Sequence, residues 1–420
     1  MITKIKTSLL GLSFILISNI AFSQVSTYSP YSRYGFGELY TNSFGQNKAM
    51  GGIGIGLRNP NTINYSNPAS YSSQDTLSFV FDIGIYSKFS NFDTQDISEK
   101  YNNANFDHIA ISFPVTKWWY SSIGVVPYSR VGYKIQNITS DPDFGDIAHF
   151  YEGFGGINKF YFGNAVNIHK NISLGFNISY LFGKIKQERN IAIADTNSYI
   201  TKLKDDILIN GFRYTFGLQY HNTINNTYFY NIGLVFTNKN TVNAEYTSSV
   251  FTYNNSSLLD TVIAPNTTKS DVTIPINIGF GISAGIKEKL TIGIDYNKQN
   301  WSGNSPFNTN NNFEDQTSIR IGTEYIPNKY SLRNYLKRIR YRAGGFYTNS
   351  YLKIGDEQIN NFGISFGVGL PTNNNKTVFN LTCELGKNGT TNNNLIKENY
   401  TFIGFNITFY DIWFFKPKYQ

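Results

Sequence analysis

Two segments of this 420-residue chain match the G-x-S-x-G pattern that presents a nucleophilic serine in many hydrolases. They cover 281–285 and 363–367, with Ser283 and Ser365 at the centre. That chemistry requires a sharp strand-to-helix turn that exposes the serine hydroxyl. Here both serines lie in stretches where every second residue is bulky and apolar, which indicates the interior of a β-strand. We therefore predict that neither serine is catalytic and that the protein is not an enzyme.

Metal-binding and redox patterns are also missing. No i,i+3 or i,i+4 spacing relates the four histidines, His108, His149, His169 and His221. We accordingly predict no metal site and no cofactor. The single cysteine, Cys383, excludes an intrachain disulfide and is in phase with apolar neighbours, which predicts a lipid-facing side chain. The adjacent acids Asp205 and Asp206 are predicted to lie in a solvated loop.

The composition indicates side chains that face lipid. Aromatic residues make up 16% of the chain and charged residues only 15%, a balance that is unusual in water-soluble proteins. After the N-terminus no run of about 18 apolar residues occurs, so a bundle of membrane-spanning helices is not expected. The formal charge is +8, or +6 without Lys4 and Lys6, and it is spread along the chain. We therefore expect no nucleic-acid partner.

The N-terminus has the layout of a secretion signal. Lys4 and Lys6 precede an apolar core over 9–17, and small residues occupy the positions before Gln24. We expect residues 1–23 to be a signal peptide and the mature chain to start at Gln24. The alternative is an apolar segment that remains as a membrane anchor.

From residue 76 onward, the dominant pattern is alternation of apolar residues with small or polar ones. A soluble β-sandwich would carry charge on its second face, whereas here that face is mostly Gly, Ser, Asn and Thr. Such a face is typical of a polar barrel lumen. Six charged residues are expected to face this lumen: Arg213, Asp295, Arg320, Glu324, Arg340 and Arg342.

About fourteen alternating runs predict an all-β fold, a transmembrane antiparallel β-barrel over residues 75–420. An even count returns both chain ends to one side, and closure leaves no unpaired edge in a bilayer. Connections after even-numbered runs are tight, as at 116–117. Those after odd-numbered runs are expected to be long outer loops, at 91–105, 302–315 and 387–399.

Residues 24–74, between the signal and the barrel, are predicted to form a plug. The glycines in this segment, Gly51 and Gly52 among them, permit backbone conformations closed to other residues, and Pro68 blocks a regular ladder. Apolar residues separate these turn formers, which indicates that the segment packs against the barrel wall. The alternative is an ordinary glycine-rich loop that precedes a β domain.

Two sets of residues, together with the strand layout, are shared with a known family. The first set is Gly51 and Gly52 followed by Asn67, Pro68 and Ala69, and the second is Gly-Ile-Asp-Tyr at 293–296 with Trp-Ser at 301–302. With fourteen strands behind a plug, the chain resembles the FadL-type outer-membrane transporters. The resemblance implies an outer-membrane barrel, surrounded by lipid in a Gram-negative bacterium. It also implies passive uptake of a hydrophobic small molecule such as a long-chain fatty acid.

Pro127 and Ser129 interrupt the apolar phase of the run 120–135, the expected third strand. Proline cannot donate to a ladder and a closed barrel has no free edge, so a bulge or an opening is expected there. FadL-type transporters have an inward kink in the third strand that opens the wall sideways. The resemblance therefore implies a lateral opening at Pro127 and Ser129. A harmless bulge and a similar role for Pro275 are the alternatives.

Two other functions remain open on the sequence alone. Barrels of the same superfamily also act as structural or secretion-system subunits that dock protein partners, here at the outer loops. An outer-membrane lipid hydrolase would need a serine and a histidine that meet near the rim. The resemblance assigns no ligand-contacting residue to a numbered position in this chain.

Overall fold

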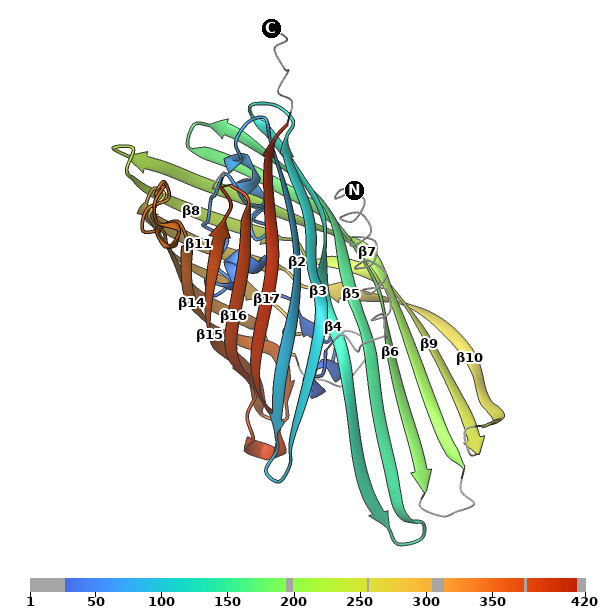
Figure 1. The fold of residues 1–420 in the computed structure, drawn as a ribbon. Helices are drawn as coiled ribbons and strands as arrows, with labels where there is room; N and C mark the ends of the chain where they lie inside the picture. Colours follow the sequence, from blue (N-terminus) through green and yellow to red (C-terminus); the bar gives the residue numbers. More distant parts are fainter. Residues whose placement is uncertain (1–26, 194–198, 255–256, 304–312, 374–375, 414–420) are drawn as a thin grey trace, which may run out of the picture.

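The computed structural model describes residues 27–193, 199–254, 257–303, 313–373 and 376–413. The expected signal peptide, residues 1–23, lies outside the described residues. Most of the described chain is β-strand (Figure 1). Within these ranges, no helix combines the length and the apolar character that crossing a membrane requires.

Fourteen strands form the wall of a barrel. Their bounds are β2 (Ser78–Asp93), β3 (Ser98–Pro114), β4 (Trp119–Asp141), β5 (Gly145–His169), β6 (Ile172–Ile193), β7 (Ile200–Ile224), β8 (Tyr228–Thr237), β11 (Asn277–Ile286), β12 (Leu290–Gln299), β13 (Gln316–Tyr325), β14 (Arg340–Ile354), β15 (Glu357–Pro371), β16 (Val378–Asn388) and β17 (Lys397–Ile412). Short elements precede or connect them: η1 (Pro30–Arg33), β1 (Glu38–Leu39), α2 (Gly45–Lys48), η2 (Pro68–Ser73), η4 (Tyr335–Lys337) and η5 (Asn392–Asn394).

Antiparallel ladders close these strands on themselves. Each strand pairs with its neighbour in chain order, β8 pairs with β11, and β17 pairs back with β2 over its whole length. The sequence prediction of a fourteen-stranded antiparallel barrel is therefore confirmed. We call the end that carries the β2–β3 turn the outer end and the opposite end, where β2 begins, the inner end.

The outer end is uneven because one side of the wall is much taller. There β9 (Asn240–Asn254) and β10 (Ser257–Ile274) pair with each other, and β9 also pairs with β7 beyond the end of β8. Residues 238–239 and 275–276 separate these strands from β8 and β11, so Pro275 lies at a strand break. The outer ends of β4–β7 together with β9 and β10 form a projecting sheet (Figure 1, lower right).

Two loop predictions are wrong. Residues 91–105 are not a long loop, because β2 and β3 continue through them and only residues 94–97 turn. Asp205 and Asp206 lie within β7, where Asp206 pairs with Lys184 at 2.7 Å and Asp205 with Arg189 at 3.1 Å. Cross-strand ion pairs stabilise strands whose sequence lacks apolar alternation, so polar composition alone does not mark a loop here.

The wall is apolar outside and polar inside. In β6, Phe176 and Phe182 are exposed whereas Ser173 and Asn177 are buried. Cys383 lies in the same outward phase as the exposed Leu381 and Leu385 of β16, as the sequence predicts. This arrangement is the inverse of a soluble protein and is typical of a barrel that faces lipid.

A buried apolar cluster fills the outer half of the barrel interior. Phe36 of the N-terminal segment lies 5.7 Å from Trp301 and 6.0 Å from Tyr128, measured between ring centroids. Inward residues of the tall wall, including Leu181 and Ile209, complete the cluster with Trp301 and Phe313 of the β12–β13 connection. The outer half is thus packed by the chain's own side chains.

Candidate functional site

The N-terminal segment, residues 27–74, lies inside the barrel and contacts strands on several sides (Figure 1, blue). Asp295 of β12 accepts hydrogen bonds from the backbone N–H groups of Gly54 and Ile55, at 2.6 and 2.8 Å. Three strands away along the wall, Gln219 of β7 donates to the carbonyl of Ile55 at 2.9 Å. The irregular backbone of this segment therefore finds its polar partners on the barrel wall, as buried backbone groups require.

The two serines of the hydrolase-like segments belong to this contact. Ser365 of β15 accepts a hydrogen bond from the N–H of Gly51 at 2.7 Å. Ser283 of β11 donates to the carbonyl of Gly56 at 2.8 Å. Both serines are therefore explained as anchors for the N-terminal segment. They lie within strands and not at the strand-to-helix turn that a nucleophilic serine needs.

Glycine at position 51 allows the segment to lie directly on the wall. Its φ is +68°, and a Cβ there would lie 2.6 Å from the carbonyl oxygens of both Gly345 and Ile321. Gly344 of β14 makes the reciprocal approach, since a Cβ on it would lie 2.2 Å from the Gly51 nitrogen. A larger residue at position 51 would be strained in its backbone and would clash with two strands.

The Asn-Pro-Ala turn starts η2 at the inner end of the segment. The side chain of Asn67 accepts a hydrogen bond from the N–H of Ala69 at 3.0 Å, which caps the helix, and Pro68 occupies the first turn. The Asn67 amide also donates to the carbonyl of Ile55 at 2.9 Å. Asn67 therefore joins the two halves of the segment, and it is fully buried.

The structure places the six predicted lumen residues on the inward face but does not bring them into one site. Arg342 and Glu324 form a buried ion pair at 2.7 Å near the inner end, and Arg340 lies beside them in the inward phase of β14. Asp295 binds the segment backbone. Asp295 also lines a cavity with Arg213 and Arg320, away from the Arg342–Glu324 pair.

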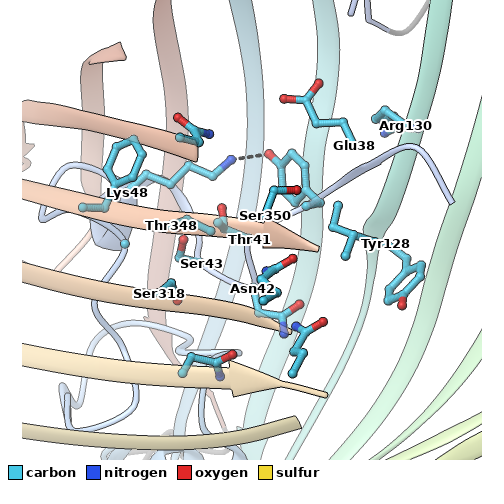
Figure 2. A pocket seen from close by; sticks show the side chains of 18 of the residues that line it. Glu38, Thr41, Asn42, Ser43, Lys48, Tyr128, Arg130, Ser318, Thr348 and Ser350 are labelled. Carbon is cyan, nitrogen blue, oxygen red and sulfur yellow. Dashed lines mark hydrogen bonds between the residues drawn. The ribbon is translucent and has the colours of Figure 1, made fainter. Parts of the chain in front are cut away.

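This cavity of about 260 Å³ lies between the N-terminal segment and the wall (Figure 2). Most of its lining side chains are hydroxyls, amides and charged groups, such as Asn42, Ser43 and Ser318. Pockets for apolar ligands are lined mainly by hydrophobic and aromatic side chains. The cavity therefore offers many polar groups to an occupant or to water, beside apolar surface from residues such as Ile55 and Phe346.

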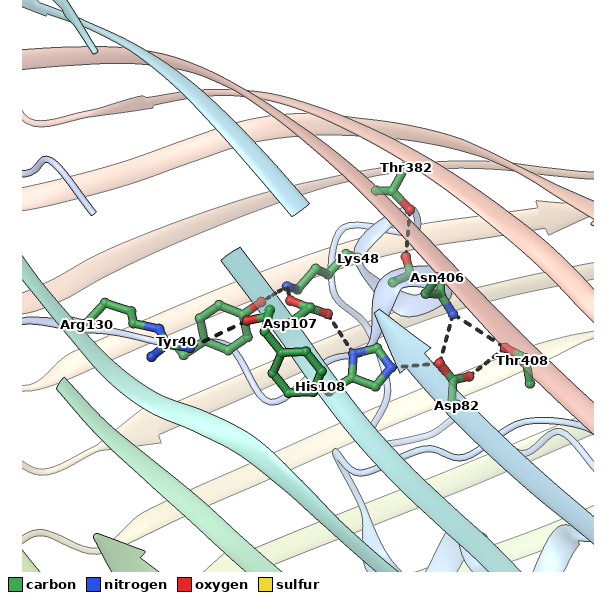
Figure 3. Close-up of polar contacts among 11 residues, drawn as sticks. Tyr40, Lys48, Asp82, Asp107, His108, Arg130, Thr382, Asn406 and Thr408 are labelled. Atoms are coloured by element: carbon green, nitrogen blue, oxygen red, sulfur yellow. Dashed lines mark hydrogen bonds and ion pairs between the residues drawn. The ribbon is translucent and has the colours of Figure 1, made fainter. Parts of the chain in front are cut away.

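A buried charged network fixes α2 to the wall (Figure 3). Lys48 lies 2.5 Å from Asp107, whose second oxygen lies 2.7 Å from the Nδ1 of His108. The Nε2 of His108 lies 2.7 Å from Asp82, and the ring of Phe44 stacks on the imidazole at 3.8 Å. Both imidazole nitrogens of His108 therefore face carboxylate oxygens, and basic and acidic side chains alternate along the network.

Sequence reasoning missed this network. Asp107 and His108 are consecutive, and in a regular strand one of them would face lipid. A bulge in β3 turns both side chains to the same face. Gly84 of β2 pairs with His108 and the next residue, Ile85, pairs with Phe106, so Asp107 has no partner residue in the ladder. Both side chains therefore point inward. Two adjacent polar residues inside an otherwise alternating run were the signal that could have revealed the bulge.

The wall is broken between β3 and β4. Their ladder ends at the pair Ile109–Val125, although both strands continue toward the outer end. Just beyond, the register with β5 shifts between Pro127 and Ser129. The free edge of β4 is instead covered by β1, through the pairs Glu38–Arg130 and Leu39–Ser129.

The space beneath this break is nearly full. Only about 10 Å³ remains among the side chains there, which include Tyr40, Phe44 and Pro127. That volume accommodates about one water molecule. In this conformation the break is therefore closed by the N-terminal segment.

These features define a class of protein, a closed fourteen-stranded barrel whose lumen holds its own N-terminal segment. Within that class the chain belongs to the BamG family, whose model matches residues 1–420. No curated protein matches the sequence.

Among the described residues, no group of three His, Cys, Asp or Glu side chains is placed to hold a metal ion.

Several solved structures share this fold, among them two toluene transporters. The Ralstonia pickettii toluene transporter TbuX has a TM-score of 0.56 at 14% identity and covers 88% of this chain and 98% of its own. The Pseudomonas putida toluene transporter TodX and a Pseudomonas aeruginosa FadL homologue both score 0.58, at 13% and 10% identity, and cover 90% of this chain and 100% of their own. Identities this low establish the shared fold alone. The FadL-type resemblance thus holds for the architecture, whereas the family of the chain is BamG.

Proposed function

We propose that the protein is an outer-membrane barrel for passive uptake of hydrophobic compounds, which leave sideways through the break between β3 and β4. The observation that carries this proposal is the ladder that ends at Ile109–Val125, beside the register shift at Pro127 and Ser129. The fold shared with toluene transporters supports it. Long-chain fatty acids are a second ligand class to test.

In this mechanism, residues 24–74 are the plug and residues 75–420 the barrel. The edge of β4 is covered by the two pairs of β1 and by backbone hydrogen bonds from Tyr40 to Tyr128 and from Ser29 to Gly132, at 2.9 and 2.7 Å. Opening therefore requires residues 29–40 to leave β4 together, after which an apolar compound can enter the bilayer without crossing water. The polar cavity deeper in the lumen would disfavour passage straight through the barrel.

Locking β1 to β4 should abolish uptake. We would replace Leu39 and Ser129 by cysteine in a Cys383→Ser background, because directly opposed antiparallel residues are close enough for a disulfide. We expect the oxidised variant to take up [¹⁴C]laurate and [¹⁴C]toluene at the rate of cells without the protein. Reduction should restore the parental rate.

The single cysteine variants provide the matched controls, since they carry the same substitutions without the crosslink. They should transport at the parental rate under oxidising conditions. Equal uptake by the locked and the reduced protein would show that β1 is not the gate. If cells that produce the parent protein take up these compounds no faster than cells with the empty vector, the transport proposal is wrong.

A second function, docking of a protein partner, is favoured by the projecting sheet. Its outward face carries cross-strand ion pairs, Lys134–Glu152 at 2.8 Å and Lys202–Glu188 at 2.5 Å, where the rest of the wall is apolar. Charged residues at this height indicate that the sheet stands clear of the bilayer.

A photo-crosslinking amino acid separates the two functions. We would place it at Val262, which is 59% exposed in β10, and at the lipid-facing Phe216 as the control position. A docking subunit should give one discrete protein adduct in intact cells from position 262 and none from 216. Adducts from neither position, together with uptake by the parent, would favour the channel.

A further inference from the structure

Two buried cations face the lumen cavity, Lys159 of β5 and Arg213 of β7. Both line the cavity, and they are 3% and 8% exposed. The Lys159 ammonium and the Arg213 guanidinium carbon each lie 5.6 Å from the ring centre of Tyr128. Two basic side chains therefore approach the same ring from different strands.

Neither cation has an acidic partner. Among the described residues, no carboxylate oxygen lies within 4 Å of the Lys159 ammonium or the Arg213 guanidinium, whereas Lys48 and Lys88 on the same cavity do pair with acids. Lys159 uses one donor, to Asn42 at 2.7 Å, and it has three. The buried Nε of Arg213 makes no hydrogen bond.

The acids that line the cavity are already engaged. Asp295 accepts from two backbone N–H groups, Glu38 pairs with Lys88 at 3.1 Å, and Glu384 accepts from Tyr400 at 3.0 Å. An unbalanced pair of buried like charges is strongly unfavourable unless something compensates it. Oxyanions are the natural complement of Lys and Arg donors.

We propose that this cavity binds a small hydrophilic oxyanion, with phosphate as the test case, held between Lys159 and Arg213. The hydroxyl and amide side chains around them, including Asn177, Ser179 and Thr215, suit a solvated polyatomic anion and not an alkyl chain. Because Asn42 belongs to the N-terminal segment, the anion would also hold that segment against the wall through Lys159. The site does not depend on the proposed uptake function.

Equilibrium dialysis of the detergent-purified full-length protein against ³²P-phosphate, at constant ionic strength, tests the site. We expect one phosphate per chain in the parent. Lys159→Gln and Arg213→Gln should each weaken binding roughly tenfold or more, because each removes a charge-assisted donor. Arg213→Lys keeps the charge and should retain part of the affinity.

Lys170→Gln is the matched control, since Lys170 is exposed in the β5–β6 turn, and it should bind as the parent does. Heat-modifiability on gels confirms that each variant is a folded barrel. The proposal is overturned by a parent that binds no phosphate, or by folded variants that bind like the parent. It is also overturned if laurate displaces the bound ³²P-phosphate at a lower concentration than unlabelled phosphate does. Lys159 and Arg213 would then hold the carboxylate of a transported acid.

Discussion

Deleting residues 24–74 should leave a barrel that still inserts into membranes but conducts ions. The wall closes through ladders among its own strands, including β17–β2 and β8–β11, and the segment contributes only the two pairs of β1. Removing it exposes the polar inward face along the inner half of the lumen. In planar bilayers we expect discrete open-channel steps from the deletion variant and none from the parent.

A shorter deletion, of residues 24–34, is the matched control. It keeps β1, α2 and η2, which occupy the lumen and cover the break, so it should remain closed. If the complete deletion were as tight as the parent, the seal would have to be the apolar cluster around Trp301 and Phe313. The plug assignment of residues 24–74 would then be wrong.

Asp82→Asn should cause the largest loss of stability among single substitutions. Asp82 is fully buried and accepts hydrogen bonds from His108, Asn406 and Thr408, at 2.7, 3.0 and 2.5 Å. The neutral amide leaves His108 with Asp107 alone, which also pairs with Lys48, so one positive charge of the network loses its counter-charge. Removal of one partner from a buried ion pair costs about 3–5 kcal/mol, so the urea midpoint of the barrel should fall clearly.

Asp96→Asn is the control, because Asp96 is exposed in the β2–β3 turn. The urea midpoint of this variant should equal that of the parent. The double variant Asp82→Asn, His108→Gln should recover part of the loss, since it removes one charge of each sign. An unchanged midpoint for Asp82→Asn would show that the four residues do not form a charged network. No recovery in the double variant would indicate that only the shape of the cluster matters.

The sequence predicts the barrel well because its signal is local. Alternation such as that of 277–285 needs only neighbouring residues, whereas the same pattern extended back to 273 crosses the break at 275–276 and is wrong there, because Ile274 is buried and Ile278 is exposed. The projecting sheet was missed because its strands are stabilised by partners across the sheet, such as Arg189 for Asp205, so charged residues interrupt the apolar alternation.

The site was less accessible to sequence reasoning for a related reason. Ser283 and Ser365 are understood only once the N-terminal segment is placed against them, at a sequence separation of more than 200 residues. Pro127 marked a disturbed ladder correctly, but the strand that covers the break comes from Glu38 and Leu39. Nothing near Lys159 or Arg213 in the sequence reveals that each lacks an acid in space.

The path of the N-terminal segment has a consequence for how the molecule assembles. Tyr31 hydrogen-bonds to the carbonyl of Ile396 in the outer β16–β17 connection, whereas η2 leads into β2 at the inner end. The segment therefore threads the barrel along its length, with its first described residues at the outer end. Since the β17–β2 ladder joins the first barrel strand to the last, this seam must close around a segment that is already threaded.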